Sequence, residues 1–137
     1  MILHLQVLSK SDFYANLISW ISLIVSMITV SLICKEFGLD KKLQIFSAFF
    51  ISSLPSVILQ ASSTSNDLVV SAFLLIFYFY QLKMIQEKSY TIILLSGIAL
   101  GLSLLTKGTS YIFIFTISTT YFFFSIIRKT QKFRYIV

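Results

Sequence analysis

The feature that most constrains this chain is the spacing of its charged residues. Only 16 of the 137 residues are Lys, Arg, Asp or Glu. They leave five uncharged intervals of 22, 24, 15, 18 and 20 residues, at 13–34, 43–66, 68–82, 89–106 and 108–127. A helix needs about 20 apolar residues to cross a hydrocarbon core roughly 30 Å thick. The third interval is shorter, and a helix there reaches this length only if it also includes a turn of the Ser/Thr-rich stretch before it. The five intervals together predict about five membrane spans.

The composition excludes two other classes of protein. With 57% hydrophobic and 12% charged residues, the chain is too apolar for an ordinary soluble domain and for a disordered chain. A nucleic-acid-binding protein gathers its basic residues on one soluble face, whereas these basic residues separate apolar runs. The net charge of +6 therefore does not indicate a nucleic-acid partner. Basic residues placed between apolar runs predict membrane lipid as the partner.

The fold class that follows is all-α, an integral membrane helical bundle. We expect one transmembrane domain over residues 1–137, with spans at about 15–34, 43–60, 66–82, 90–106 and 110–127. Three local features qualify this picture. Pro55 can kink the second span, Gly38 is a plausible C-cap of the first, and Gly97-x-x-x-Gly101 is typical of close helix packing.

The distribution of Lys and Arg predicts the orientation. The segments 35–42, 83–88 and 128–137 together hold nine basic residues, whereas 1–12, 61–67 and 106–109 hold two. Short loops rich in Lys and Arg stay in the cytoplasm. The N-terminus is therefore expected outside and the C-terminus in the cytoplasm. An outward N-terminus with no preceding helix also suggests that the chain is part of something longer.

Two outer segments carry candidate site residues. Asn66 and Asp67 end a polar stretch before the third span, where they could serve only as a helix N-cap. An ionisable residue at membrane depth is also a functional candidate, so Asp67 could face a polar cavity and contact substrate. Lys107 lies where the charge pattern predicts no lysine. It either extends to the outer headgroups or provides a fixed cation for an anionic group such as a lipid phosphate.

These features occur in an order that resembles a known superfamily. The order is Leu54-Pro55, then Gln60-Ala61-Ser62-Ser63-Thr64-Ser65-Asn66-Asp67, then Gly97-x-x-x-Gly101, then Leu104-Leu105-Thr106-Lys107-Gly108-Thr109. It resembles the GT-C superfamily of multi-span glycosyltransferases. Within that superfamily it is similar to the group of protein O-mannosyltransferases and aminoarabinose lipid A transferases.

The resemblance implies a function. Such enzymes transfer a sugar from a polyprenyl-phosphate carrier to an acceptor on the extracytoplasmic side, using an acidic residue in a large first outer loop as the base. By analogy, Asp67 would lie at the floor of the active site and Lys107 near the carrier phosphate, and Asn66 is expected to bind substrate or donor with them. The base and its preceding span have no counterpart here. The chain is thus expected to be a partial module, inactive alone unless a second chain supplies them.

Other points stay open at this stage. Cofactors are unknown: the sequence offers no metal-ligand cluster, although a divalent metal could bind through the missing loop of a full-length enzyme. The expected location is a bacterial cytoplasmic (inner) membrane. Two alternative functions are a small transporter subunit, with Asn66, Asp67 and Lys107 along a solute path, and a non-catalytic membrane scaffold.

Overall fold

The computed structural model describes residues 16–63, 66–87 and 89–134, and this part of the chain contains helices and turns but no strand. Its helices are α2 (Leu17–Glu36), α3 (Lys41–Ser52), α4 (Pro55–Ser62), α5 (Asp67–Gln86), α6 (Tyr90–Thr106) and α7 (Ser110–Arg134). The predicted all-α fold is therefore confirmed.

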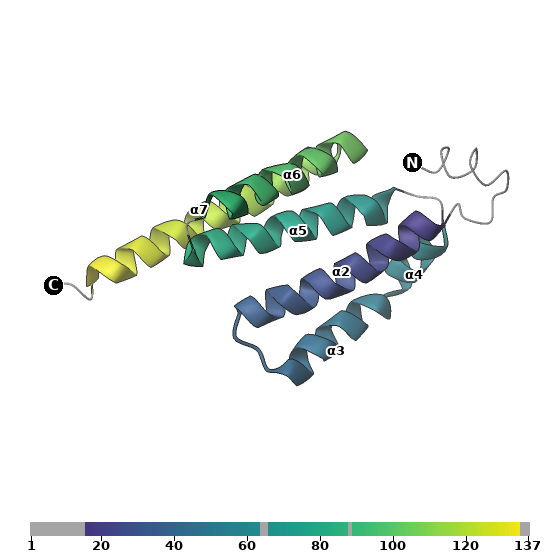
Figure 1. Ribbon diagram of the computed structural model, residues 1–137, viewed down its shortest axis with the longest axis horizontal. Coiled ribbons are helices and arrows are strands. Elements are labelled where there is room, and N and C mark those ends of the chain that lie inside the picture. Colours follow the sequence, from purple (N-terminus) through teal and green to yellow (C-terminus); the bar gives the residue numbers. More distant parts are fainter. Residues whose placement is uncertain (1–15, 64–65, 88, 135–137) are drawn as a thin grey trace.

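Helix α5 is the centre of the arrangement. It packs against α2 on one side and α6 on the other, while α3 packs against α2 and α7 packs against α5 and α6 (Figure 1). Helix α4 lies against the N-terminal part of α2 and also contacts α5. The turns before α5 and between α6 and α7 consequently lie toward the same end of the bundle, opposite the α2–α3 turn (Figure 1).

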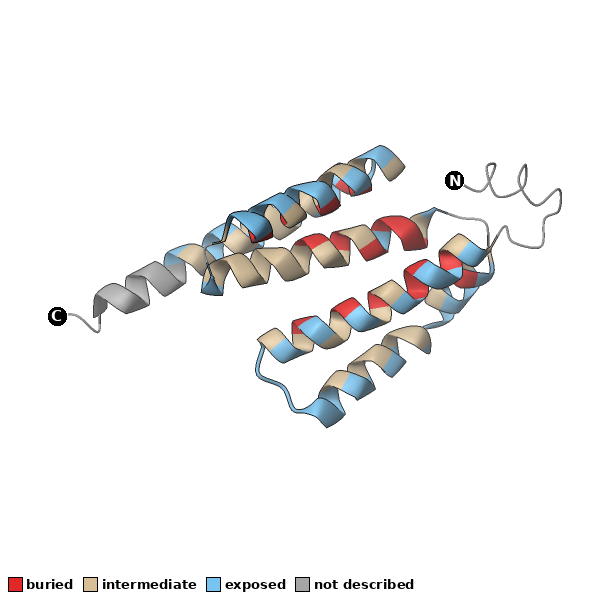
Figure 2. Cartoon of the chain, viewed as in Figure 1, coloured by how far each residue is buried: buried red, intermediate tan, exposed pale blue. Residues whose placement is uncertain are grey.

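The side chains of α2 are arranged in the opposite way to those of a helix in a soluble protein, because polar residues face inward and large apolar residues face outward. Its buried face carries small polar residues, Ser22, Ser26 and Thr29, whose hydroxyls donate to backbone carbonyls one turn earlier at 2.7–2.8 Å. Its outer face carries large apolar residues such as Trp20 and Ile28, which are more than half exposed (Figure 2). Small residues let membrane helices approach closely, and lipid accepts the apolar outer face. This pattern supports the prediction of a membrane bundle.

Helix α6 packs through a different face from the one predicted. Its buried small residues are Ser96, Ala99 and Ser103. Gly97 is exposed, and a Cβ atom added at Gly97 or Gly101 would meet no other atom within 4 Å. Within the described residues, the expectation that the glycine pair forms the helix–helix contact is wrong, because the serine and alanine face supplies the close approach instead.

The second predicted span is broken in two. Helices α3 and α4 meet at an angle of 61°, with Pro55 as the first residue of α4. Proline suits that position because it lacks the N–H that would bond the preceding turn and its φ already matches a helix. The proline therefore ends one helix and starts the next rather than bending a continuous one.

The number of membrane crossings stays a prediction. By length and composition α2 and α5 can each cross a membrane, and the bent pair α3–α4 counts as a third candidate. Helix α6 and the segment Ser110–Phe123 of α7 are shorter apolar helices. Two of the five predicted spans therefore match a full-length candidate within the described residues.

The turn after α2 is built as predicted. Gly38 has φ +77°, a conformation that costs residues with a Cβ about 1–2 kcal/mol. The Gly38 N–H donates to the Lys35 carbonyl at 2.9 Å and the Leu39 N–H to the Cys34 carbonyl at 3.1 Å. This bond pair closes the last turn of α2 and reverses the chain into α3.

Candidate functional site

The structure brings two predicted site residues into direct contact. Lys107, in the turn between α6 and α7, donates a hydrogen bond from Nζ to Oδ1 of Asp67 at the start of α5, and the two form an ion pair. Their side chains are 44% and 43% exposed. An acidic group and a basic group 40 residues apart in sequence thus share one location at the end of the bundle.

Local structure explains where Asp67 lies. It is the first residue of α5, where the partial positive charge of the helix end favours a carboxylate. Asn66 holds the N-cap position, but its side chain makes no capping hydrogen bond. Asn66 therefore occupies the N-cap position of α5, as one alternative predicted. It does not make the side-chain hydrogen bond to the first turn that this alternative implied. Asn66 directly precedes Asp67 in sequence and is not among the residues that line the cavity described below.

The backbone that carries Lys107 is fixed by a buried serine. The Ser110 hydroxyl lies 2.6 Å from the Lys107 carbonyl and 2.9 Å from the Ser103 carbonyl. Ser103 and Ser110 are both fully buried. The turn between α6 and α7 is therefore held from inside, and the Lys107 side chain is directed toward α5 from a defined backbone position.

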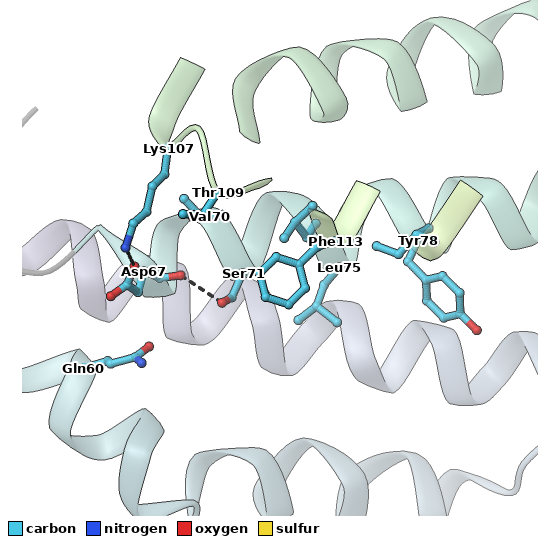
Figure 3. A pocket seen from close by; sticks show the side chains of 11 residues that line it. Gln60, Asp67, Val70, Ser71, Leu75, Tyr78, Lys107, Thr109 and Phe113 are labelled. Atoms are coloured by element: carbon cyan, nitrogen blue, oxygen red, sulfur yellow. Dashed lines mark hydrogen bonds and ion pairs between the residues drawn. The ribbon is translucent and has the colours of Figure 1, made fainter. Parts of the chain in front are cut away.

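The ion pair lies at one end of a cavity of about 680 Å³ between α5 and α7 (Figure 3). The cavity has two chemically different parts. Its polar end is lined by Gln60, Asp67, Ser71, Lys107 and Thr109, and its long apolar part by Val70, Leu74, Leu75, Tyr78, Phe113 and Ile117. From Asp67 to Tyr78 the lining follows α5 for eleven residue steps, about 16.5 Å at 1.5 Å per residue.

Sequence reasoning did not identify Gln60 as a site residue. Gln60 lies near the end of α4 and lines the polar end of the cavity. A signal was present, because Gln60 begins the polar string that ends at Asp67. It becomes informative only once α4 is known to be separate from α3, since that break decides which way the end of α4 faces.

A second cavity lies on another side of α5. It measures about 280 Å³ and is lined by Ile18, Ile21, Ser22, Val25, Val69, Ala72 and Phe73. Its one hydroxyl, on Ser22, already donates to the Ile18 carbonyl at 2.8 Å. This smaller cavity therefore offers apolar surface and no charged group.

The larger cavity suits an amphiphile with an anionic head. An ammonium group binds a phosphate as a point charge, and the apolar part can hold a hydrocarbon chain. Within the described residues, no group of three or more His, Cys, Asp and Glu side chains could hold a metal ion. The site is thus described by an ion pair, a carboxamide and an apolar channel.

Comparison with known proteins gives one clear result. A family model described as dolichyl-phosphate-mannose-protein mannosyltransferase matches residues 1–137. No curated protein and no solved structure matches the chain significantly. The family match agrees with the resemblance seen in the sequence and spans both segments that supply the ion pair.

Proposed function

This chain belongs to the dolichyl-phosphate-mannose-protein mannosyltransferase family, and we propose that it holds a polyprenyl-phosphate-linked sugar in the cavity between α5 and α7. Membership makes it part of a mannosyltransferase-like membrane glycosyltransferase. The finer proposal is that transfer takes place on the extracytoplasmic face, at the end of the bundle that carries Asp67 and Lys107. In a bacterial cell this places the chain in the cytoplasmic membrane.

One observation carries the proposal: the charged end and the apolar part belong to the same cavity. A polyprenyl phosphate is divided in the same way, into an anionic head and a long hydrocarbon chain. Lys107 would hold the phosphate, and the surface from Val70 to Ile117 would hold the first part of the prenyl chain. The alternative that Lys107 only extends to the outer lipid headgroups does not explain why it pairs with a carboxylate. It also does not explain the apolar channel that starts beside Lys107.

The proposal also gives each charged residue a role. As the bond between sugar and phosphate breaks, negative charge grows on the leaving phosphate, and a fixed cation stabilises that charge. In the structure Asp67 neutralises Lys107, so an arriving phosphate competes with Asp67 for the ammonium group. The displaced carboxylate then lies beside the sugar, where it can accept hydrogen bonds from sugar or acceptor hydroxyls.

The test is binding of farnesyl phosphate, a short polyprenyl phosphate, to the purified chain in lipid nanodiscs. We expect Lys107→Gln to weaken binding at least tenfold, because a charged hydrogen bond to the phosphate is lost. Lys41→Gln, at the exposed start of α3, is the matched control and should bind normally. Farnesol should bind far more weakly than farnesyl phosphate.

Two outcomes would contradict the proposal. Equal binding by the Lys107→Gln variant would remove the phosphate role of Lys107. Equally tight competition by dioleoyl phosphatidate would mean that the site accepts ordinary lipid phosphates and does not select a prenyl carrier.

A further inference from the structure

The end of α4 is fixed more firmly than its eight-residue length suggests. Ala61 is 1% exposed and packs in a buried cluster with Leu23 and Leu68. The Asn16 amide donates from Nδ2 to the Ser62 carbonyl at 2.9 Å. These contacts attach the end of α4 to α2 and α5, so the residue just before Ala61 has a defined direction.

That residue is Gln60, and its side chain extends from α4 into the space below Asp67 (Figure 3). It lines the same cavity as Asp67 and Lys107. The structure gives its carboxamide no hydrogen-bond partner among the described residues. A carboxamide carries two donor hydrogens and an acceptor oxygen, and here they face the polar end of the cavity.

The two arms of a donor molecule would lie in different parts of this cavity. A carrier-linked sugar is a phosphodiester, with the prenyl chain on one side of the phosphate and the sugar on the other. The apolar lining continues from Lys107 along α5 toward Tyr78, so that direction takes the prenyl chain. The sugar must then point toward the polar end, where Gln60 and Thr109 lie.

We propose that Gln60 is a specificity-determining residue that recognises the sugar through its carboxamide. This inference rests on the proposed function, since it assumes that the phosphate lies at Lys107. A neutral group that both donates and accepts matches neighbouring hydroxyls on a sugar ring, whereas Lys107 matches the phosphate. The break at Pro55 serves the site by turning α4 by 61° from the axis of α3, and Gln60 then lines the same cavity as the ion pair.

The experiment compares two ligands on the full chain in nanodiscs: farnesyl phosphate and mannosyl-phosphoryl-farnesol. We expect the wild-type chain to bind the mannosylated ligand more tightly by about fivefold to tenfold, the size of one or two hydrogen bonds. Gln60→Met keeps the side-chain length and the packing of α4. It should bind farnesyl phosphate normally and lose the preference for the mannosylated ligand.

The control is Gln44→Met on α3. Gln44 donates to the Leu39 carbonyl at 2.7 Å, away from the cavity lining, so this variant should keep the preference. A preference that persists in Gln60→Met, or is absent from the wild-type chain, would overturn the inference and leave the proposed function intact. Failure of both ligands to bind the wild-type chain would instead overturn the proposed function and the inference with it.

Discussion

Among the described residues, helix α5 lines a larger and a smaller cavity that differ in one decisive respect. The larger begins at the Asp67–Lys107 ion pair and continues as an apolar channel. The smaller is lined by Ser22 and apolar residues of α2 and α5 and contains no charged side chain. Spaces between membrane helices are filled readily by lipid chains, so an apolar space alone does not specify a ligand. A fixed charge at the end of such a space does specify a ligand, because it favours one with an opposite charge at that position.

The first way to break this comparison is to find the ion pair on the cytoplasmic side, where outward sugar transfer would be impossible. In a Cys34→Ala background, Gly108→Cys beside Lys107 should react completely with a membrane-impermeant thiol reagent added to intact cells. Asp40→Cys, in the exposed α2–α3 turn, should react only after the cells are opened. The reverse labelling pattern would place the larger cavity on the wrong side.

The second prediction concerns Asp67. Asp67→Asn should lower the rate of mannose transfer by about a hundredfold, measured in a preparation that shows transfer with the wild-type chain. This is the scale typical of losing one charged or hydrogen-bonding group in an active site. The variant should also strengthen farnesyl phosphate binding by up to about fivefold, because an exposed ion pair is worth at most about 1 kcal/mol and no longer competes for Lys107.

Ser22→Ala, in the smaller cavity, is the control for this prediction and should change neither transfer nor binding. Weaker phosphate binding by Asp67→Asn would contradict the competition between carboxylate and phosphate. Membrane insertion of both variants should match that of the wild-type chain.

The third prediction sharpens the comparison by filling one cavity at a time. Leu75 and Phe73 are two residues apart on α5 and line the larger and the smaller cavity respectively. Leu75→Trp should weaken farnesyl phosphate binding about tenfold, about 1.4 kcal/mol, because the larger side chain occupies space that the prenyl chain needs. Phe73→Trp should leave binding unchanged. Equal effects of the two variants, measured by titration in nanodiscs, would remove the distinction between the cavities.

The smallest expected effect concerns the turns. Ser110→Ala removes the buried hydroxyl that fixes the Lys107 turn. It should lower the free energy of unfolding by about 1 kcal/mol and the affinity for farnesyl phosphate about threefold. Gly38→Ala strains the opposite turn by about 1–2 kcal/mol and should lower stability without changing affinity. A loss of affinity in both variants would mean that stability alone controls binding.

Sequence reasoning predicted the helices better than it predicted their contacts. The charge gaps indicated where helices run, and α6 covers residues 90–106 as expected. The buried face of α6 was missed, because lipid tails are as apolar as the side chains and hydrophobicity does not decide which face turns inward. Small residues permit close approach without requiring it, and here Ser96, Ala99 and Ser103 are used in place of the glycine pair.

Two of the predicted site residues, Asp67 and Lys107, lie in contact in the structure, but sequence reasoning did not predict that contact. Asp67 was identified as an ionisable residue at membrane depth, and Lys107 as an exception to the charge pattern. Their pairing depends on how α5 packs against α6 and α7, which no local pattern encodes. Gln60 was missed because its direction depends on the break before Pro55, and a proline in a membrane helix can produce either a kink or a complete break.

The most direct test of the account is photo-crosslinking with a farnesyl phosphate analogue that carries a diazirine on its prenyl chain. After irradiation in nanodiscs, peptide mass spectrometry identifies the labelled residues. We expect label on the larger cavity, at residues 74–78 of α5 and 113–117 of α7, with loss of label in Lys107→Gln and in the presence of excess farnesyl phosphate. Label centred on the smaller cavity, or spread evenly over the lipid-facing surface, would contradict the claim that the ion pair and the apolar channel form one carrier site.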